Sequence, residues 1–272
     1  DLTGDWSSDV CSSISFFIDK TGKVAKDLPK IAGIGSLNFD GTLIKSLVDS
    51  RLSYLNKNGK VIYSQNTIIP LNYQYKIIEE KFKPTKDYLV YYPKIQGVSN
   101  KATQNTVNNQ LKSLSLVKPI NSELQLDYSY FGDFSVEFFK KDLLILKLDG
   151  YNFPFGAAHG MPSMIYPHVN LINGRFYKLE DLFKQNSNYV KVLSDIIAKQ
   201  IKHDPQYSYV FPGSYKGITD NQGFYLNGNT LFIYFTPYDI GPYAVGFPTF
   251  KIPFKDIISI INTHGEFWRS FN

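Results

Sequence analysis

The stretch GFYLNGNTLFIYFTPYDIGPYAVGFPTFKIPF, residues 223–254, carries the clearest strand pair of the sequence and its most unusual loop. Residues 231–235 form an unbroken run of aliphatic and aromatic side chains, which is typical of a strand covered on both faces. Asn227 and Gly228 precede this run and suit a tight hairpin turn, so residues 223–226 are expected to be its antiparallel neighbour. We therefore predict that residues 231–235 form a central strand.

A loop rich in proline and glycine follows this strand. Within twelve residues the sequence places Pro237, Gly241, Pro242, Gly246 and Pro248. These residues recur too often for a helix or for a ladder of strand hydrogen bonds, so we expect a rigid loop at a strand end. Binding residues are commonly mounted on such loops. The candidate ligand-binding side chains that this loop carries are Tyr238, Asp239 and Tyr243.

A second continuous apolar run, Leu143-Leu144-Ile145-Leu146, is the other candidate for the centre of a sheet. We expect residues 143–148 and 231–235 to be central strands of one sheet, with side chains buried on both faces. Further strands are expected at residues 73–82, 87–95, 124–131, 133–139 and 143–151.

Two segments, residues 100–116 and 188–203, show the 3.6-residue spacing of an amphipathic helix. The apolar positions expected to face the sheet are Val107, Leu111 and Leu114, then Val190, Leu193, Ile197 and Ile201. Residues 255–262 should add a helical turn or two, and residues 265–272 should form a tail. The predicted fold class is therefore α+β: a mixed, mainly antiparallel sheet with two packed helices, preceded by short β-hairpin repeats.

The first residues differ from the remainder of the chain. Residues 1–13, DLTGDWSSDVCSS, are polar and without period, and they contain the only cysteine. They resemble a translated sequencing adapter, with a disordered tail as the alternative, and both interpretations exclude them from function. The sequence opens without a signal peptide, so we expect a fragment of a longer protein. The expected organisation is a leader at 1–13, a β-repeat remnant at 14–66 and one α/β domain at 67–272.

A short repeat marks the second of these parts. The segment FIDKTGKV at residues 17–24 returns 37 residues later as YLNKNGKV at residues 54–61. Each copy reads as strand, polar turn and strand, with Asp or Asn entering the turn and Gly at a position of positive φ. The pattern resembles WG repeats, although the tryptophan that names them is absent. A chance similarity between two common turns is the alternative.

The bulk composition excludes several function classes. The net charge of +5 comes from scattered lysines, and no nucleic-acid-binding signature is present, so a nucleic acid partner is not expected. A single cysteine permits neither an intramolecular disulfide nor a cysteine zinc site. No apolar stretch is long enough to span a membrane. With 20 Tyr and 21 Phe, the chain favours strands, and its aromatic side chains serve either the core or a binding surface.

Candidate catalytic groups are sparse. A zinc site built from His159, His168 and Asp239 would lack the usual ligand spacing, so we predict no metal and no cofactor. No nucleophile motif occurs, and we assign no catalytic residue. Paired carboxylates for glycoside hydrolysis stay open, with Glu137, Asp149 and Asp239 as candidates. His159 lies in a glycine-rich loop after a predicted central strand and is the fourth candidate ligand-binding residue.

Three passages of the sequence share a resemblance. They are TPYDIGPYAVGFPTFKIPFKDI from residue 236, GAAHG at 156–160 and NLINGRFYKLEDLF at 170–183. The three passages occur along the chain in the same order as in the family, and they resemble the extracellular domain shared by the anti-sigma factor RsiV and the peptidoglycan deacetylase PdaC, over roughly residues 70–262. Asp239 stands where that family has Glu, and Gly241 where it has Ala. In PdaC-like proteins the deacetylase is a separate downstream domain, and the present sequence ends without it.

The resemblance implies a non-catalytic recognition or sensing domain of the bacterial cell envelope, facing outward and binding a protein or cell-wall polysaccharide. The domain of RsiV binds lysozyme, but lysozyme is strongly basic and a partner of charge +5 would repel it at long range. The alternative is a cell-wall polysaccharide hydrolase or deacetylase-associated module with a site near His159 and Asp239. That alternative requires the two side chains to converge in one pocket.

Overall fold

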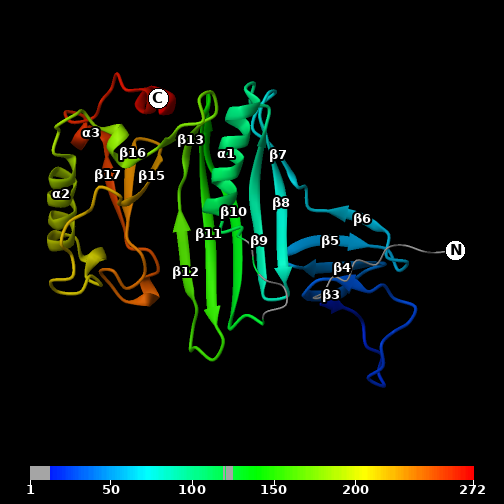
Figure 1. Ribbon diagram of the computed structural model, residues 1–272. Coiled ribbons are helices and arrows are strands. Elements are labelled where there is room, and N and C mark those ends of the chain that lie inside the picture. Colours follow the sequence, from blue (N-terminus) through cyan, green and yellow to red (C-terminus); the bar gives the residue numbers. More distant parts are fainter. Residues whose placement is uncertain (1–12, 119, 121–124) are drawn as a thin grey trace.

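The computed structural model describes residues 13–118, 120 and 125–272 (Figure 1). The leader expected at residues 1–13 therefore lies outside the described residues, apart from Ser13. Three β-structures follow one another along the described chain: small hairpin sheets, an eight-stranded sheet, and a three-stranded sheet that is followed and covered by helices. The predicted mixed α+β class, with mainly antiparallel sheets after N-terminal hairpins, is confirmed.

The hairpin sheets occupy the N-terminal end of the described chain. A two-stranded sheet pairs β1 (Ile14–Ser15) with β2 (Ile31–Ala32). A four-stranded antiparallel sheet follows in the order β3 (Gly35–Asp40), β4 (Leu43–Val48), β5 (Arg51–Leu55) and β6 (Val61–Ser64).

The repeated segments form the same turn in both copies. The carboxylate of Asp19 accepts hydrogen bonds from the backbone N–H groups of Thr21 and Lys23, at 2.8 and 3.0 Å. In the second copy the side chain of Asn56 accepts from the N–H groups two and four residues later, both at 3.0 Å. Gly22 and Gly59 both have φ of 81°, as the predicted turn requires. This geometry explains the repeated letters through turn chemistry and does not itself identify a repeat family.

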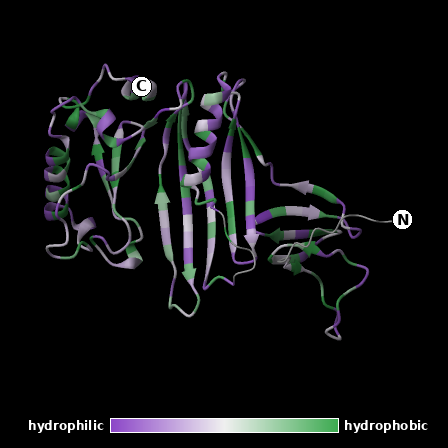
Figure 2. Cartoon of the chain, viewed as in Figure 1, coloured by the Kyte–Doolittle hydropathy of each residue, from purple (hydrophilic) through white to green (hydrophobic). Residues whose placement is uncertain are grey.

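The large sheet has the order β14-β13-β11-β10-β9-β8-β7, with β12 also paired to β11. Every pairing is antiparallel except that of β9 with β10. In Figure 2 its strands carry mixed hydrophobic and hydrophilic colouring, as expected where burial differs along a strand. The strands are β7 (Ile68–Pro70), β8 (Lys76–Thr85), β9 (Tyr88–Gln96), β10 (Tyr128–Lys140), β11 (Leu143–Pro154), β12 (Met161–Ile165), β13 (His168–Asn170) and β14 (Phe176–Tyr177).

The two strands predicted at 124–131 and 133–139 are in fact the single strand β10, so that prediction was wrong. Gly132 does not interrupt the strand but pairs with Gly150 of β11. A Cβ atom at residue 132 would lie 3.3 Å from the ring of Tyr130 and from Val90. Glycine is therefore present because neighbouring side chains pack closely over the backbone, and not because the chain turns.

The parallel pair β9 and β10 is joined through helix α1 (Lys101–Leu114), in agreement with the predicted helix. Asn100 caps this helix by accepting from the N–H groups of Ala102 and Thr103. The side-chain amide of Asn108 bonds both the N–H and the C=O of Ile95, at 2.7 and 3.0 Å. The helix therefore supplies hydrogen bonds to β9 beyond the three residue pairs through which β9 meets β10.

The C-terminal part holds the three-stranded sheet β15 (Gly223–Asn227), β16 (Thr230–Tyr234) and β17 (Thr249–Pro253), with β16 in the centre. In the hairpin between β15 and β16, only Gly228 has a positive φ, and the turn lies one residue later than expected. The helical elements are η1 (Leu179–Leu182), α2 (Tyr189–His203), η2 (Pro205–Tyr207), η3 (Tyr243–Val245), α3 (Phe254–Ile257) and α4 (Glu266–Phe271).

Residues 143–148 and 231–235 were expected in one sheet, and this expectation was wrong. The first run lies in the large sheet and the second in the three-stranded sheet, although each is central and almost entirely buried. Both edges of β16 are taken by β15 and β17, so β16 has no edge left for β11. The two helices likewise cover different sheets: Val107 and Leu111 pack against the large sheet, and Leu193 and Ile197 against the small one.

The segment 265–272 was expected to be a tail, and this expectation was also wrong. It contains α4, whose Phe267 and Phe271 are buried in the core of the C-terminal part. The ring of Phe271 packs 4.8 Å from that of Phe138 on β10. The four-residue spacing of these phenylalanines on a helix is the sequence signal that was not used.

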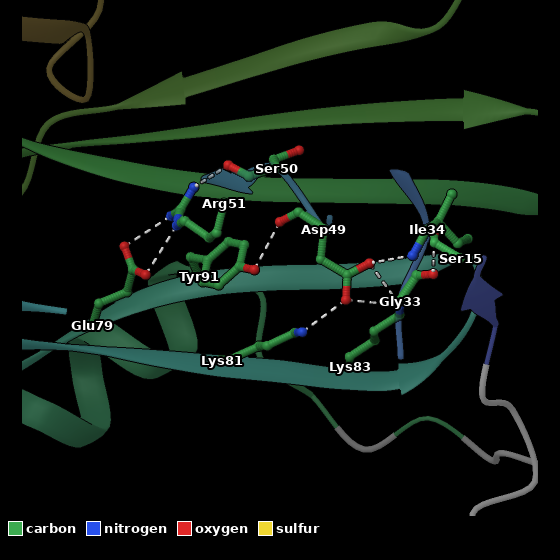
Figure 3. A network of polar contacts seen from close by, with 10 residues as sticks. All are labelled: Ser15, Gly33, Ile34, Asp49, Ser50, Arg51, Glu79, Lys81, Lys83 and Tyr91. Carbon is green, nitrogen blue, oxygen red and sulfur yellow. Dashed lines mark hydrogen bonds and ion pairs between the residues drawn. The ribbon is translucent and has the colours of Figure 1, made fainter. Parts of the chain in front are cut away.

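A charged network joins the hairpin sheet to the large sheet (Figure 3). The buried carboxylate of Asp49, in the turn between β4 and β5, accepts from Lys81 at 2.7 Å and from Lys83 at 2.8 Å. Arg51 makes paired hydrogen bonds to both Glu79 and Asp133, all at 2.8–2.9 Å. Burial alone would raise the pKa of Asp49, but the hydrogen bonds from the two lysines and from the N–H of Ile34, together with the charge of Lys81, outweigh it and lower that pKa.

Leu193→Ala tests the packing of α2. The side chain is fully buried, so its truncation should lower the free energy of unfolding by about 2–5 kcal/mol. The control Lys199→Ala, on the exposed face of the same helix, should change it by less than about 0.5 kcal/mol. Denaturant unfolding measures both values, and equal small effects would contradict the position of Leu193 in the core.

Asp49→Asn tests whether the charged network stabilises the contact between the hairpin sheet and the large sheet. The substitution leaves Lys81 and Lys83 beside a neutral group, and since Lys81 is partly exposed we expect a loss of about 2 kcal/mol rather than the larger cost of a fully buried pair. Asp40→Asn, at an exposed position of the same sheet, is the matched control. If both variants unfold at the same denaturant concentration as the parent, the network does not stabilise the junction.

Candidate functional site

The loop between β16 and β17 is fixed at its base and on one side. The N–H of Phe235 donates to the carbonyl of Pro248 at 2.9 Å, which closes the loop. The carbonyl of Ile240 accepts from the N–H of Phe211 at 2.9 Å and from the hydroxyl of Ser214 at 3.0 Å. The loop that the prolines and glycines predicted is therefore tied to the body of the protein.

Residues 236–239 form a turn in which a tyrosine takes a position that usually holds glycine. The N–H of Asp239 donates to the carbonyl of Thr236, and Pro237 lies at the second position. Tyr238 follows with φ of 73°, in a turn position where glycine is usual after proline. Its side chain is 52% exposed, so burial does not compensate for the strained backbone.

Tyr238 belongs to a group of four rings, which we call the aromatic cluster: Tyr151, His159, Tyr238 and Tyr243. The imidazole of His159 stacks on Tyr243 with ring centroids 4.1 Å apart, and the rings of Tyr238 and Tyr243 lie 5.7 Å apart. The hydroxyl of Tyr238 lies 3.2 Å from Nε2 of His159, and Nδ1 of His159 lies 3.0 Å from the carbonyl of Gly160. With the proton on Nδ1, both contacts are hydrogen bonds.

The backbone N–H and C=O groups of Gly160 hold the tyrosines of the cluster in place. The N–H of Gly160 donates to the hydroxyl of Tyr151 at 2.9 Å, and its carbonyl accepts from the hydroxyl of Tyr243 at 2.8 Å. A Cβ atom on residue 160 would lie 2.4 Å from the carbonyl oxygen of Asn152, so only glycine fits. The segment GAAHG thus places His159 beside the loop of Tyr238 and Tyr243.

The structure therefore brings three of the four predicted site residues together. Tyr243 packs onto the GAAHG segment, as a structural role requires, whereas Tyr238 and His159 are exposed. Asp239 is not part of the cluster, because its carboxylate accepts from the N–H and the hydroxyl of Thr236 at 2.8 and 2.7 Å. Tyr151 was missed by sequence reasoning, since its role depends on the pairing of β11 with β12.

The side chains of His159 and Asp239 are not arranged as an acid–base pair. Each side chain is bonded to other partners, and no hydrogen bond joins them in the part of the chain that the structure describes. Within those same residues, no group of three or more His, Cys, Asp or Glu side chains is placed to hold a metal ion.

His168, the other histidine considered for zinc, lies in the core. Pro167 separates β12 from β13, and His168 begins β13 with 1% of its surface exposed. Its ring stacks on Phe224 with centroids 4.3 Å apart, and within the described residues neither ring nitrogen meets a partner at hydrogen-bond geometry, the backbone of Tyr166 being the polar group that bears on the ring. Burial lowers the pKa of His168 to about 3, and the nearby carbonyl of Tyr166 only partly opposes this shift.

The buried His168 should make stability depend on pH. The ordinary pKa of 6.5 applies to the unfolded chain, which binds a proton that the native protein excludes. The free energy of unfolding should therefore fall by up to about 1.4 kcal/mol per unit as the pH drops from about 6.5 toward 3. Urea unfolding across this range should show a shallower slope for His168→Phe, while a variant of the exposed His203 keeps the parent slope. If the free energy of unfolding depends on pH equally in His168→Phe and in the parent, the imidazole of His168 is not buried in its neutral form.

A separate cavity of about 660 Å³ lies where β14, η1, the start of α2 and α4 meet. Its wall includes the stacked rings of Phe183 and Tyr189, 4.7 Å apart and nearly parallel. Sequence reasoning placed Phe183 only at the end of a passage that carries the family resemblance and Tyr189 only in a predicted helix, because a cavity between distant elements leaves no local pattern. Asp239 lines another cavity, of about 540 Å³, whose lining includes none of the four residues of the aromatic cluster.

Comparison with known proteins identifies part of the chain. Residues 180–255 match the family model described as "Protein of unknown function (DUF3298)". The DUF3298 domain is the one found in RsiV and PdaC, so the resemblance holds for this part of the chain, and the match does not extend to the hairpin repeats. The loop of Tyr238 and Tyr243 lies inside the matched residues and His159 outside them.

Solved structures share the fold. A DUF3298 family member from Bacteroides fragilis is 19% identical, with a TM-score of 0.51 over 73% of this chain and 96% of its own. A DUF3298 family protein from Pseudomonas aeruginosa is 16% identical, with a TM-score of 0.52 over 71% of this chain and 95% of its own. No curated protein matches the chain significantly. Among the described residues, no helix has the length and apolar character needed to cross a membrane.

Proposed function

We propose that this protein is a non-catalytic recognition module of the bacterial cell envelope, which binds a protein or a cell-wall polysaccharide through the aromatic cluster. The DUF3298 match and the resemblance to RsiV and PdaC support an extracellular or envelope-associated setting. The cluster supplies flat rings and hydroxyl groups at the surface, which suit either kind of ligand.

Tyr238 carries this proposal. Holding a residue other than glycine at φ of 73° costs about 1 kcal/mol or more. The residue is 52% exposed, and within the described chain its side-chain hydrogen bond to His159 lies at the surface, so packing supplies little in return. A strained, exposed aromatic side chain is explained best by a contact that forms only when a ligand binds.

The surroundings of Tyr238 favour binding over chemistry. Pro237 fixes the backbone on one side, and the stacked rings of His159 and Tyr243 hold the neighbouring surface in place. Because these groups are already ordered, little conformational entropy is lost on binding. The ring nitrogens of His159 are engaged within the cluster, so the imidazole serves as a platform rather than as a free base.

Tyr238→Gly separates a binding role from a structural one. Glycine relieves the backbone strain while it removes the ring, so the free energy of unfolding should change by less than about 1 kcal/mol. Binding to the ligand should weaken by more than about 1 kcal/mol, as expected for an aromatic anchor. The ligand class is established first, by cosedimentation with purified bacterial cell walls and by capture from host secretions.

Tyr73→Ala is the matched control, because Tyr73 is 99% exposed and lies on a different part of the chain. This variant should bind like the parent protein. If Tyr238→Gly also binds like the parent, or if its loss of binding follows a loss of folding seen by circular dichroism, the aromatic cluster is not the recognition surface.

A further inference from the structure

The hairpin sheets at the N-terminal end of the described chain expose much apolar surface (Figure 1). About half of the large hydrophobic side chains that are exposed in the described chain lie between residues 14 and 68, a small part of the sequence. On the edge strand β6, Val61, Ile62 and Tyr63 are 53, 55 and 53% exposed. Single exposed apolar residues need no explanation, but three in succession on one strand indicate a surface that contacts a partner.

Strand β6 also lacks the usual protection of a sheet edge. It pairs with β5 on one side, and no strand of the described chain pairs with its other side. Edge strands are commonly shielded by charged side chains or proline, and the residues VIYS at 61–64 include neither. Apolar side chains therefore point to both faces of an open edge.

Lysines surround this apolar edge. Residues 13–66 contain seven lysines and one arginine against four aspartates. Asp49 and Arg51 are engaged in the charged network with the large sheet, and Asp19 accepts hydrogen bonds within its own turn. The lysines are all exposed, and none is paired with a carboxylate of residues 13–118, 120 or 125–272. They are Lys20, Lys23, Lys26, Lys30, Lys45, Lys57 and Lys60.

The repeated turns place four of these lysines in matching pairs. Each copy has one lysine two residues before the turn glycine and another directly after it. The pairs are Lys20 and Lys23 in the first copy, and Lys57 and Lys60 in the second. The turn hydrogen bonds use the side chain of Asp or Asn and backbone N–H groups, so they do not account for the lysine side chains. A Cβ atom on Gly59 would lie 3.1 Å from Pro29, so the second turn touches the link that leaves the first.

Exposed apolar side chains among unpaired cations favour one kind of partner. A second copy of the chain would bring two groups of lysines together, and like charges repel. A soluble anionic polymer would attract the lysines but would leave the side chains of β6 in water. A membrane surface with anionic lipids offers phosphate groups to the lysines and an apolar region to Ile62, and tyrosine suits the boundary between the two.

We propose that the hairpin sheets dock on an anionic lipid surface, with β6 at the boundary between headgroups and acyl chains and the lysine pairs of the two turns on lipid phosphates. This surface shares no residue with the aromatic cluster, so the proposal does not rest on recognition by Tyr238.

The test is cosedimentation of the full chain with lipid vesicles at physiological ionic strength. Vesicles of phosphatidylglycerol and phosphatidylcholine should bind the parent protein saturably, and vesicles of phosphatidylcholine alone should not. Replacement of Lys20, Lys23, Lys57 and Lys60 by glutamine should weaken binding at least about tenfold, because each lysine near an anionic surface adds to the attraction. All four positions are exposed, and circular dichroism confirms folding.

A second set of four lysines supplies the matched control. Glutamine at Lys199, Lys202, Lys216 and Lys255, all exposed in the C-terminal part, lowers the net charge equally. This variant should bind the vesicles like the parent, because salt screens charges that lie more than about 10 Å from the lipid. Equal losses in the two variants would overturn the proposal, since binding would then follow net charge and not the hairpin surface.

Ile62→Ser tests the apolar contact. The substitution should weaken binding about fivefold, because the half-exposed side chain would enter the lipid boundary. Ile172→Ser, at a residue 63% exposed outside the hairpin sheets, should have no effect, and neither should Tyr238→Gly. The proposal is overturned if the parent does not bind the anionic vesicles, or if Ile62→Ser binds as the parent does. It is also overturned if sedimentation velocity without lipid shows self-association that Ile62→Ser abolishes, since a second copy would then cover β6.

Discussion

The fold depends on the burial of both faces of β11. Its side chains alternate, so Leu143 and Ile145 enter the core that includes α2 and the three-stranded sheet, while Leu144 and Leu146 enter the core beneath α1. A strand with two apolar faces is stable only when both are covered, which obliges the two halves of the α/β region to assemble around it. The aromatic cluster lies where the two halves meet.

This constraint also explains where irregular features are tolerated. Strands β12 and β13 pair with the same strand β11, and the break at Pro167 between them lets His168 turn into the core. At the other end of β11, the close approach of Gly160 to Asn152 turns the chain beneath the rings of the aromatic cluster. The regular strand therefore supports irregular segments at both of its ends, and irregular segments carry the groups available for recognition.

Local features were predictable from the sequence, and non-local pairing was not. The two amphipathic helices, α1 and α2, were predicted to within two residues at their ends, because the spacing of Val107 and Leu111, or of Leu193 and Ile197, is a local property. Both apolar runs were correctly expected to be central strands. Their separation into two sheets depends on which strands pair with their edges, and the residues of the two runs do not specify these partners.

The candidate site shows the same division. Tyr238 and Tyr243 were predicted from the turn residues around them, and His159 from its glycine-rich loop. Asp239, chosen by its charge and by the resemblance, proved to bond within its own turn. The burial of His168 had no sequence signal, because it results from rings contributed by β15 and α4.

The charged network between the hairpin sheet and the large sheet has a mechanical consequence. Asp49 and Arg51 attach the turn between β4 and β5 to side chains of β8 and β10, so a load on the hairpin sheet passes sideways through ion pairs as well as along the main chain. The guanidinium of Arg51 also rests 3.6 Å above the ring of Tyr91, which resists sliding. The corner between the sheets is therefore held by side-chain pairs as well as by the main chain, and because these pairs are largely buried, added salt should screen them only weakly.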